Sequence, residues 1–278
     1  MRIKVFGLLL PVLLLTGRAK AVDPLLPHSA RSVGMSGANV VLTDHWTGFC
    51  NPAGIAAAGT PTAGISYINY YLVPEMGTGS LSGIIPTRTG NFGLDYASTG
   101  NKYFATNHAG VVFGRAIGKK IRTGIEVNYI LIRQPKGYGN LYAFVPSVGI
   151  QFLPSENILA GVMVFNPAKQ KMLPAGEISL PFIIRAGIGY RLGRELMICL
   201  EAEKRSEEKM SIHCGTEISF SEKIKIRLGG ASGTYTTCSF GAGFRFGRMN
   251  IDLGVSRHPV LGFSPCLSIV YFTQKQVY

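Results

Sequence analysis

From about residue 62 onward, apolar and polar side chains alternate one by one along the chain. In residues 121–131, one face runs from Ile121 to Leu131 and is largely apolar, whereas the other face carries Arg122 and Glu126. Successive side chains of a β-strand point to opposite faces, so this period of two predicts strands with one apolar and one polar face. The sequence therefore predicts an all-β fold.

The alternation recurs in about fourteen segments, and an even number of strands is typical of single-chain bacterial barrels. Residues 62–273 number 212, so each strand with its connection takes roughly 15 residues, as expected for transmembrane strands of about 9–11 residues with short turns. We therefore predict a transmembrane antiparallel β-barrel of about 14 strands. The segments are 62–71, 78–86, 90–98, 106–116, 120–133, 140–153, 157–166, 181–192, 195–204, 209–220, 223–230, 234–246, 249–256 and 262–273.

A soluble β-sandwich is the alternative fold, because its strands alternate as well. A sandwich with this many strands would more often split into two domains, and its outer face should be rich in Lys, Thr and Glu. Here the polar face carries Gly, Ser, Arg and Glu, and the opposite face is continuously apolar. Only 15% of the residues are charged, against about 25% in an average soluble protein, and 35 are glycine. These features favour the barrel.

The connections alternate between tight and mostly longer, as a barrel requires. We expect the tight ones to be periplasmic turns and the longer ones to be outer loops, with both chain termini in the periplasm. The tight set is 118–120, 154–156, 193–194, 221–223 and 247–248, and the longer set is 133–140, 166–180, 204–209, 230–234 and 257–262.

The first residues read as an export signal. A basic start, Met1–Lys4, precedes an apolar run, Val5–Leu15, and a small-x-small site at 19–21. The apolar run is too short to span a bilayer as a helix, which needs about 20 residues. We predict a signal peptide at 1–21, a plug or hatch at 22–59 and an outer-membrane barrel at 60–278. Cleavage would remove four cations, so the mature charge is 24 − 15 = +9.

Residues 28–58 lack alternation and are rich in small side chains, a composition that can pack inside a lumen. This segment resembles the amino-terminal hatch of the FadL/PorV-like (PorV/PorQ) outer-membrane β-barrel family, in which an Ala-Arg-x-x-Gly-Met-x-Gly-Ala run precedes an acidic residue and Asn-Pro-Ala-Gly. The resemblance implies a fourteen-stranded barrel behind the hatch. The matching residues are Ala30, Arg31, Gly34, Met35, Gly37, Ala38, Asp44, Asn51, Pro52, Ala53 and Gly54.

Several of these residues have a local physical role. Gly34 and Gly37 should allow the hatch backbone to approach the wall closely. We expect Asn51 to bond to neighbouring backbone groups, as it commonly does in turns, and Pro52 to end a helical turn. For Asn51 and Pro52, seating the hatch is the interpretation we favour over direct contact with a ligand.

Charged residues on the polar face must avoid lipid, because Arg or Lys at the membrane midplane costs about 2–4 kcal/mol. We therefore expect them to line the lumen, either as a charged permeation path or, as we favour, as cross-strand pairs that fill a plugged lumen. These residues are Arg122, Glu126, Arg185, Arg191, Glu201, Glu203, Glu217, Lys225, Arg227, Arg245 and Asp252.

Motifs for enzymatic, metal or nucleic-acid chemistry do not occur. The chain lacks GxSxG, HExxH and a P-loop, and Glu217 would lie roughly 13 Å along a strand from His213, too far to orient that imidazole for hydrolysis. The histidines and five cysteines lack metal-ligand spacing. Lys and Arg are dispersed without a nucleic-acid-binding module. We predict no enzyme activity, no cofactor, no metal and no nucleic-acid partner.

Two function classes remain. One is a non-transporting barrel that serves as a subunit or docking platform of an outer-membrane secretion machine, as the PorV-like branch does in type IX secretion; the short loops and plug favour it slightly. The alternative is a FadL-like channel for uptake of small hydrophobic molecules. The expected location is the Gram-negative outer membrane. The expected partners are its lipid and lipopolysaccharide phosphates, with other outer-membrane or periplasmic proteins or a small hydrophobic ligand.

Overall fold

The computed structural model describes residues 28–135, 137–174 and 178–273. The predicted signal peptide, residues 1–21, and positions 22–27 of the predicted plug lie outside the described residues.

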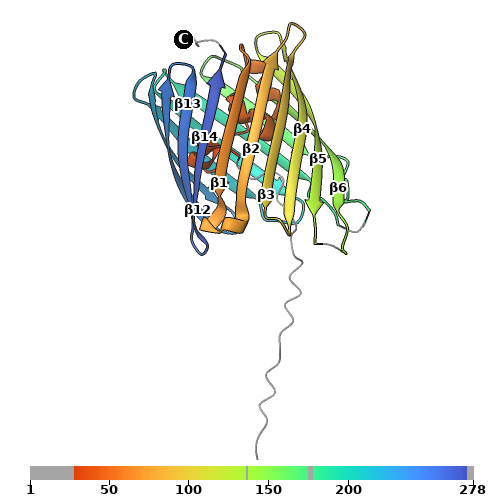
Figure 1. The fold of residues 1–278 in the computed structure, drawn as a ribbon. Helices are drawn as coiled ribbons and strands as arrows, with labels where there is room; N and C mark the ends of the chain where they lie inside the picture. Colours follow the sequence, from red (N-terminus) through yellow and green to blue (C-terminus); the bar gives the residue numbers. More distant parts are fainter. Residues whose placement is uncertain (1–27, 136, 175–177, 274–278) are drawn as a thin grey trace, which may run out of the picture.

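Fourteen antiparallel strands form one closed barrel in which every strand pairs with its sequence neighbours (Figure 1). β1 also pairs with β14, with Thr62 opposite Phe272, and this pairing closes the sheet. The predicted barrel and its strand count are confirmed, and each predicted boundary lies within two residues of the observed one. The strands are β1 Thr62–Asn69, β2 Gly77–Pro86, β3 Asn91–Gly100, β4 Ala105–Ile117, β5 Ile121–Arg133, β6 Leu141–Phe152, β7 Ile158–Phe165, β8 Ile183–Leu192, β9 Leu196–Arg205, β10 Ser211–Ser219, β11 Ile224–Ser232, β12 Thr236–Phe246, β13 Met249–His258 and β14 Gly262–Phe272.

The apolar face of the strands points outward. In β5, Ile125 and Val127 are more than half exposed, whereas Glu126 and Asn128, which alternate with them, are buried. Exposed Leu94 on β3 repeats this arrangement. An apolar exterior around a polar interior is the pattern of a barrel whose solvent is lipid.

The two ends of the barrel differ in their connections. The tight turns lie at the end where β14 finishes, and the mostly longer connections lie at the opposite end, called here the loop end (Figure 1). Two of the loop-end connections, 233–235 and 259–261, are as short as the turns, because β11 and β13 each extend two residues further than predicted. Gly193 and Gly247 sit in tight turns with φ of 64° and 59°, a left-handed conformation that glycine adopts without steric cost. The loop between β1 and β2 contains two short 3₁₀ turns, η3 Tyr70–Leu72 and η4 Pro74–Met76.

Residues 28–58, the hatch, lie inside the barrel, where Figure 1 shows them as red and orange coils behind β1 and β2. They form the short helix α1 Ala30–Gly34 and two 3₁₀ helices, η1 His45–Phe49 and η2 Pro52–Ala57. α1 packs against β11–β14, η1 against β1–β3, and η2 against β3–β6. No helix within the described ranges is long and apolar enough to cross a membrane.

A belt of inward-facing glycines makes room for the hatch. A Cβ atom at Gly124 would overlap the backbone of Pro52, and one at Gly149 would overlap the side chain of Asn51. Around the rest of the wall, the hatch residues Ala30, Gly34, Met35 and Val40 occupy the space that side chains would otherwise take. The glycines they face are Gly161, Gly187, Gly215, Gly229, Gly241 and Gly254. Much of the unusual glycine content therefore has a steric purpose.

Pro52 was expected to end a helical turn, and this expectation is wrong. It occupies the first turn of η2, so it begins a helical turn instead of ending one. The physical reason is that proline lacks an N–H, and the first turn of a helix has N–H groups without partners in any case. Asn51 caps this helix, because its side-chain oxygen accepts from the N–H of Ala53 at 3.1 Å.

We expect a methyl group in the glycine belt to unseat the hatch. Gly124→Ala should destabilise the folded barrel by about 1–3 kcal/mol, the usual cost of overpacking, because its Cβ meets backbone that cannot rotate away. The matched control is Gly79→Ala on β2, where an added Cβ meets no described atom within 4 Å. Heat-modified mobility and limited proteolysis in detergent measure the effect, and equal behaviour of the two variants would contradict it.

Candidate functional site

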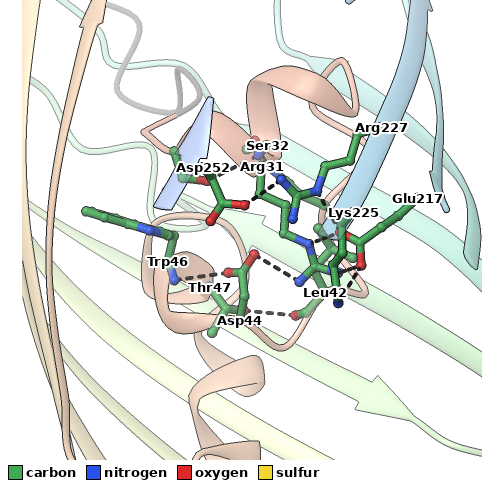
Figure 2. Close-up of polar contacts among 12 residues, drawn as sticks. Arg31, Ser32, Leu42, Asp44, Trp46, Thr47, Glu217, Lys225, Arg227 and Asp252 are labelled. Atoms are coloured by element: carbon green, nitrogen blue, oxygen red, sulfur yellow. Dashed lines mark hydrogen bonds and ion pairs between the residues drawn. The ribbon is translucent and has the colours of Figure 1, made fainter. Parts of the chain in front are cut away.

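The hatch is tied to the wall by a buried ion cluster, called here the latch cluster: Arg31, Asp44, Glu217, Lys225, Arg227 and Asp252 (Figure 2). Arg31 of α1 reaches Glu217 on β10 with both Nε (2.7 Å) and Nη2 (2.9 Å). It also contacts Asp44 of the hatch at 3.2 Å. Arg227 on β11 bridges Glu217 at 2.7 Å and Asp252 on β13 at 2.6 Å.

The latch cluster is electrically balanced, with three cations and three carboxylates. Glu217 lies at its centre and accepts from Arg31, Arg227 and Lys225, although its side chain is only 4% exposed. Burial by itself would lower the pKa of Arg31, but the carboxylates of Glu217 and Asp44 outweigh it and raise the pKa. Buried charges are tolerated when they are paired and hydrogen-bonded, so removing one partner should be costly.

A second ion cluster holds the turn that follows α1. Arg185 on β8 pairs with Glu201 (2.6 Å) and Glu203 (3.2 Å) on β9, and Glu203 also contacts Arg205 at 2.6 Å. The same groups bind hatch backbone. Arg185 donates to the carbonyl of Gly37 at 2.8 Å, and Glu201 accepts from the N–H groups of residues 39 and 40, both at 2.8 Å.

Amide side chains complete the attachment of the hatch on the other wall. Gln151 on β6 donates to the carbonyls of Val40 and Leu42, both at 3.1 Å. Asn91 on β3 donates to the carbonyl of Ile55 at 2.7 Å and to that of Ala58. The sequence prediction missed both amides, although each stands on the polar face of its strand, because an uncharged amide is not excluded from lipid as strongly as a charge.

The remaining motif residues pack without polar chemistry. Ala30, Met35, Ala38 and Ala53 are fully buried. A Cβ at Gly54 would overlap the hydroxyl of Thr47 in η1. All eleven motif positions therefore belong to the hatch inside the lumen, and their part in function stays a prediction.

Four predicted network charges stand outside the two clusters. Arg122, Glu126 and Arg191 form no ion pair with any residue that the structure describes, and Arg245 donates to the amide oxygen of Asn250 at 2.9 Å. Glu126 lies over Gly110 instead, on the wall away from the cations. Cross-strand pairing thus holds for part of the predicted set. Glu126 on β5 lies away from the cations of β8–β13, whereas Arg245 on β12 contacts an amide instead of a carboxylate.

His213, considered above for hydrolysis together with Glu217, contacts the hatch and Ser211. His213 donates from Nδ1 to the carbonyl of Ser36 at 2.7 Å, and its Nε2 lies 3.0 Å from the hydroxyl of Ser211. This places His213 in the seating of the hatch. Among the described positions, no group of three or more His, Cys, Asp or Glu side chains could hold a metal ion.

Comparison with known proteins shows what the architecture is similar to. No family model matches the chain, and no curated protein matches it. Among solved structures, the toluene transporter TodX of P. putida superposes with a TM-score of 0.70 at 11% identity, covering 91% of this chain and 100% of that one. A FadL homologue of Pseudomonas aeruginosa gives a TM-score of 0.70 at 11% identity, covering 90% and 99%.

This chain has a FadL-type barrel fold. The superposition extends over nearly the whole of both chains, so it includes the closed wall. The FadL part of the predicted resemblance is therefore supported at the level of fold, and the PorV-specific part stays a prediction.

Loss of Arg31 should loosen the hatch. Arg31→Met removes the cation that Glu217 and Asp44 share, and breaking a buried pair costs about 3 kcal/mol or more. The control is Arg194→Met, an exposed cation in the tight turn between β8 and β9. The only tryptophan of the chain, Trp46, lies buried in the hatch, so its fluorescence during urea titration reports the difference. Identical transitions for both variants would contradict the prediction.

Acid should also weaken the seating of the hatch. Burial lowers the pKa of His28 to about 3 and that of His45 to about 4, whereas exposed imidazoles titrate near pH 6.5. Between pH 6.5 and 4 a displaced hatch binds more protons than a seated one, so seating is fully favoured above pH 6.5 and weakens as the pH falls. Trp46 fluorescence at pH 7.5 and pH 5 tests this, and a variant with His28→Gln and His45→Gln should lose most of the dependence.

Proposed function

We propose that this protein is a non-enzymatic outer-membrane channel for small hydrophobic molecules, exported by its signal peptide, in which the hatch is the movable plug. The fold supports this, because the structures similar to it include the toluene transporter TodX, which is also described as a monoaromatic hydrocarbon channel. The observation that carries the proposal is an apolar groove in the outer wall directly behind the hatch.

The groove has a volume of about 830 Å³ and crosses β1–β6 and the edge of β14. Small outward residues form its floor: Ala63 stands directly opposite Gly83 on the neighbouring strand, and Ala109 continues it on β4. Larger side chains such as Leu94 and Phe144 form its sides. Its size and lining suit a small apolar ligand, since ligand sites are typically concave, largely apolar and of about 300–1,000 Å³.

The hatch touches the inner side of the same stretch of wall. A Cβ at Gly64 on β1 would meet the ring of His45, and Asp95 on β3 fills the space beside Gly48. Gly64 and Asp95 also line the groove. One layer of backbone thus separates the hatch from a membrane-facing apolar surface, and displacement of η1 would change this layer first.

Filling the groove should slow transport. Gly83→Phe places a ring on the floor of the groove, and we expect toluene entry to fall about tenfold or more, since losing 1.4 kcal/mol is a factor of ten. The control is Gly79→Phe on the same strand and the same outward face, because Gly79 does not line the groove. The rate of toluene entry is measured in vesicles with lipopolysaccharide in the outer leaflet and compared with the rate in protein-free vesicles. If the wild-type protein does not raise this rate, the proposed function is contradicted.

The docking-platform reading remains a second, untested proposal, favoured only by the short connections at the loop end, such as 233–235 and 259–261. The comparisons give it less support than the channel, because the similar structures include a toluene transporter. Affinity purification in mild detergent with mass spectrometry discriminates between them. Recovery of the barrel alone, with a bound apolar ligand, would remove the platform reading.

A further inference from the structure

Four exposed cations lie at the tight-turn end of β2–β5, next to the apolar groove, and form what is called here the basic rim: Arg88, Arg115, Lys119 and Lys120. Arg88 lies in the turn between β2 and β3, and Arg115 lies near the end of β4. The two lysines lie in the turn between β4 and β5. Residues 86–92 and 113–123 contain no acidic side chain, so this part of the wall carries a surplus of positive charge.

The fold brings the two arginines to the same edge of the barrel. A Cβ at Gly90, in the turn between β2 and β3, would lie 2.9 Å from the carbonyl oxygen of Gly114 on β4. This turn is closed by a hydrogen bond from the N–H of Thr87 to the carbonyl of Gly90 at 3.0 Å. Arg88 lies within the turn, and Arg115 directly follows Gly114. Their charges therefore add at one place and attract an anion.

A continuous apolar surface joins the basic rim to the groove. On β4, the outward residues run from Val111 through Phe113 to Arg115, and Val111 lines the groove. Phe113 packs on Phe92 of β3 with ring centroids 5.0 Å apart, and Ile85 of β2 stands opposite Phe92 and is 60% exposed. At about 3.3 Å per residue, Arg115 lies about 13 Å along the strand from Val111.

The position of the basic rim relative to a bilayer follows from the cost of burying charge. Arg or Lys facing lipid at the membrane midplane costs about 2–4 kcal/mol, so the rim must lie at the level of the headgroups. The groove beyond it then lies at the level of the acyl chains. Arginine binds phosphate through paired hydrogen bonds, and basic residues beside a membrane attract anionic headgroups. One surface thus offers both an anion site and an apolar groove.

We propose that the groove and the basic rim together bind one anionic phospholipid, with its phosphate on the rim and an acyl chain over Phe92 and Phe113 into the groove. A free phosphate would use only the rim and a neutral hydrocarbon only the groove, whereas a phospholipid uses both. In the predicted orientation, with the tight turns in the periplasm, this lipid belongs to the inner leaflet of the outer membrane. The inference goes beyond the proposed channel function, because a lipid can bind this surface whether or not toluene crosses the protein.

The test compares phosphatidylglycerol with phosphatidylcholine, chosen with the same acyl chains but a zwitterionic headgroup. Native mass spectrometry of the protein in detergent counts the bound lipids during a titration. We expect one phosphatidylglycerol to bind at least about tenfold tighter than phosphatidylcholine. Arg115→Gln combined with Lys119→Gln should remove most of this preference, since each cation beside a membrane contributes about fivefold. Gly83→Phe, which fills the groove, should weaken the binding of both lipids.

The matched control combines Arg194→Gln with Lys223→Gln. These cations lie in tight turns away from the groove, and each has a glutamate next to it in the chain, so this variant should keep the preference. Gly79→Phe is the control for the filled groove. Heat-modified mobility checks that each variant is folded, and the four substituted cations are exposed.

Equal binding of the two lipids to the wild type would overturn the inference, and so would an equal loss in the rim and control variants. Glycerol 3-phosphate lacks acyl chains and should not displace phosphatidylglycerol; if it does, the rim is a phosphate site and the lipid inference is wrong. Toluene entry into vesicles is measured separately. A protein that admits toluene without preferring phosphatidylglycerol contradicts only this inference, whereas one that prefers this lipid without admitting toluene contradicts only the channel.

Discussion

Glu217 accepts charge-assisted hydrogen bonds from three cations that come from the hatch and from β11, and the arrangement of the lumen depends on it. Its carboxylate is almost completely buried, so it is stable only while these partners surround it. Arg31 is the one partner that the hatch supplies. When the hatch is seated, Arg31 therefore neutralises part of the charge that surrounds Glu217 on the wall. This coupling suits the proposed movable plug, because water can replace these ionic contacts when the hatch leaves.

The two sides of the lumen hold the hatch by different kinds of interaction. Ion clusters occupy the wall from β8 to β13 and hold α1 and the turn after it. Amides and close backbone packing hold η2 and residues 40–42 against β3–β6. The apolar groove lies on the outside of β1–β6, where the wall carries fewer ionic ties to the hatch. Under the proposed channel function, the hatch would separate first from this side of the wall, because fewer ionic contacts hold it there.

Strand number and strand faces were predictable because each depends on neighbours along the chain. Alternation places Glu217 and Arg227 on the inner face, and the Asn-Pro-Ala-Gly run identifies the hatch. The partners of each charge were not predictable. Glu126 and Arg122 share the alternation of Glu217, yet the structure places them outside the clusters, because pairing depends on where the hatch lies within the barrel.

The sequence by itself determined a closed fourteen-stranded wall, a polar lumen and a small-residue segment able to fill it, since a period of two and a supply of glycine are local properties. The tertiary structure alone decided which glycine faces which hatch residue, that Pro52 begins a helix, and that Ala63 and Tyr271 line one groove. Those relations join residues as far apart in the chain as Ala30 and Gly254, and the chain brings them together only when β14 closes onto β1.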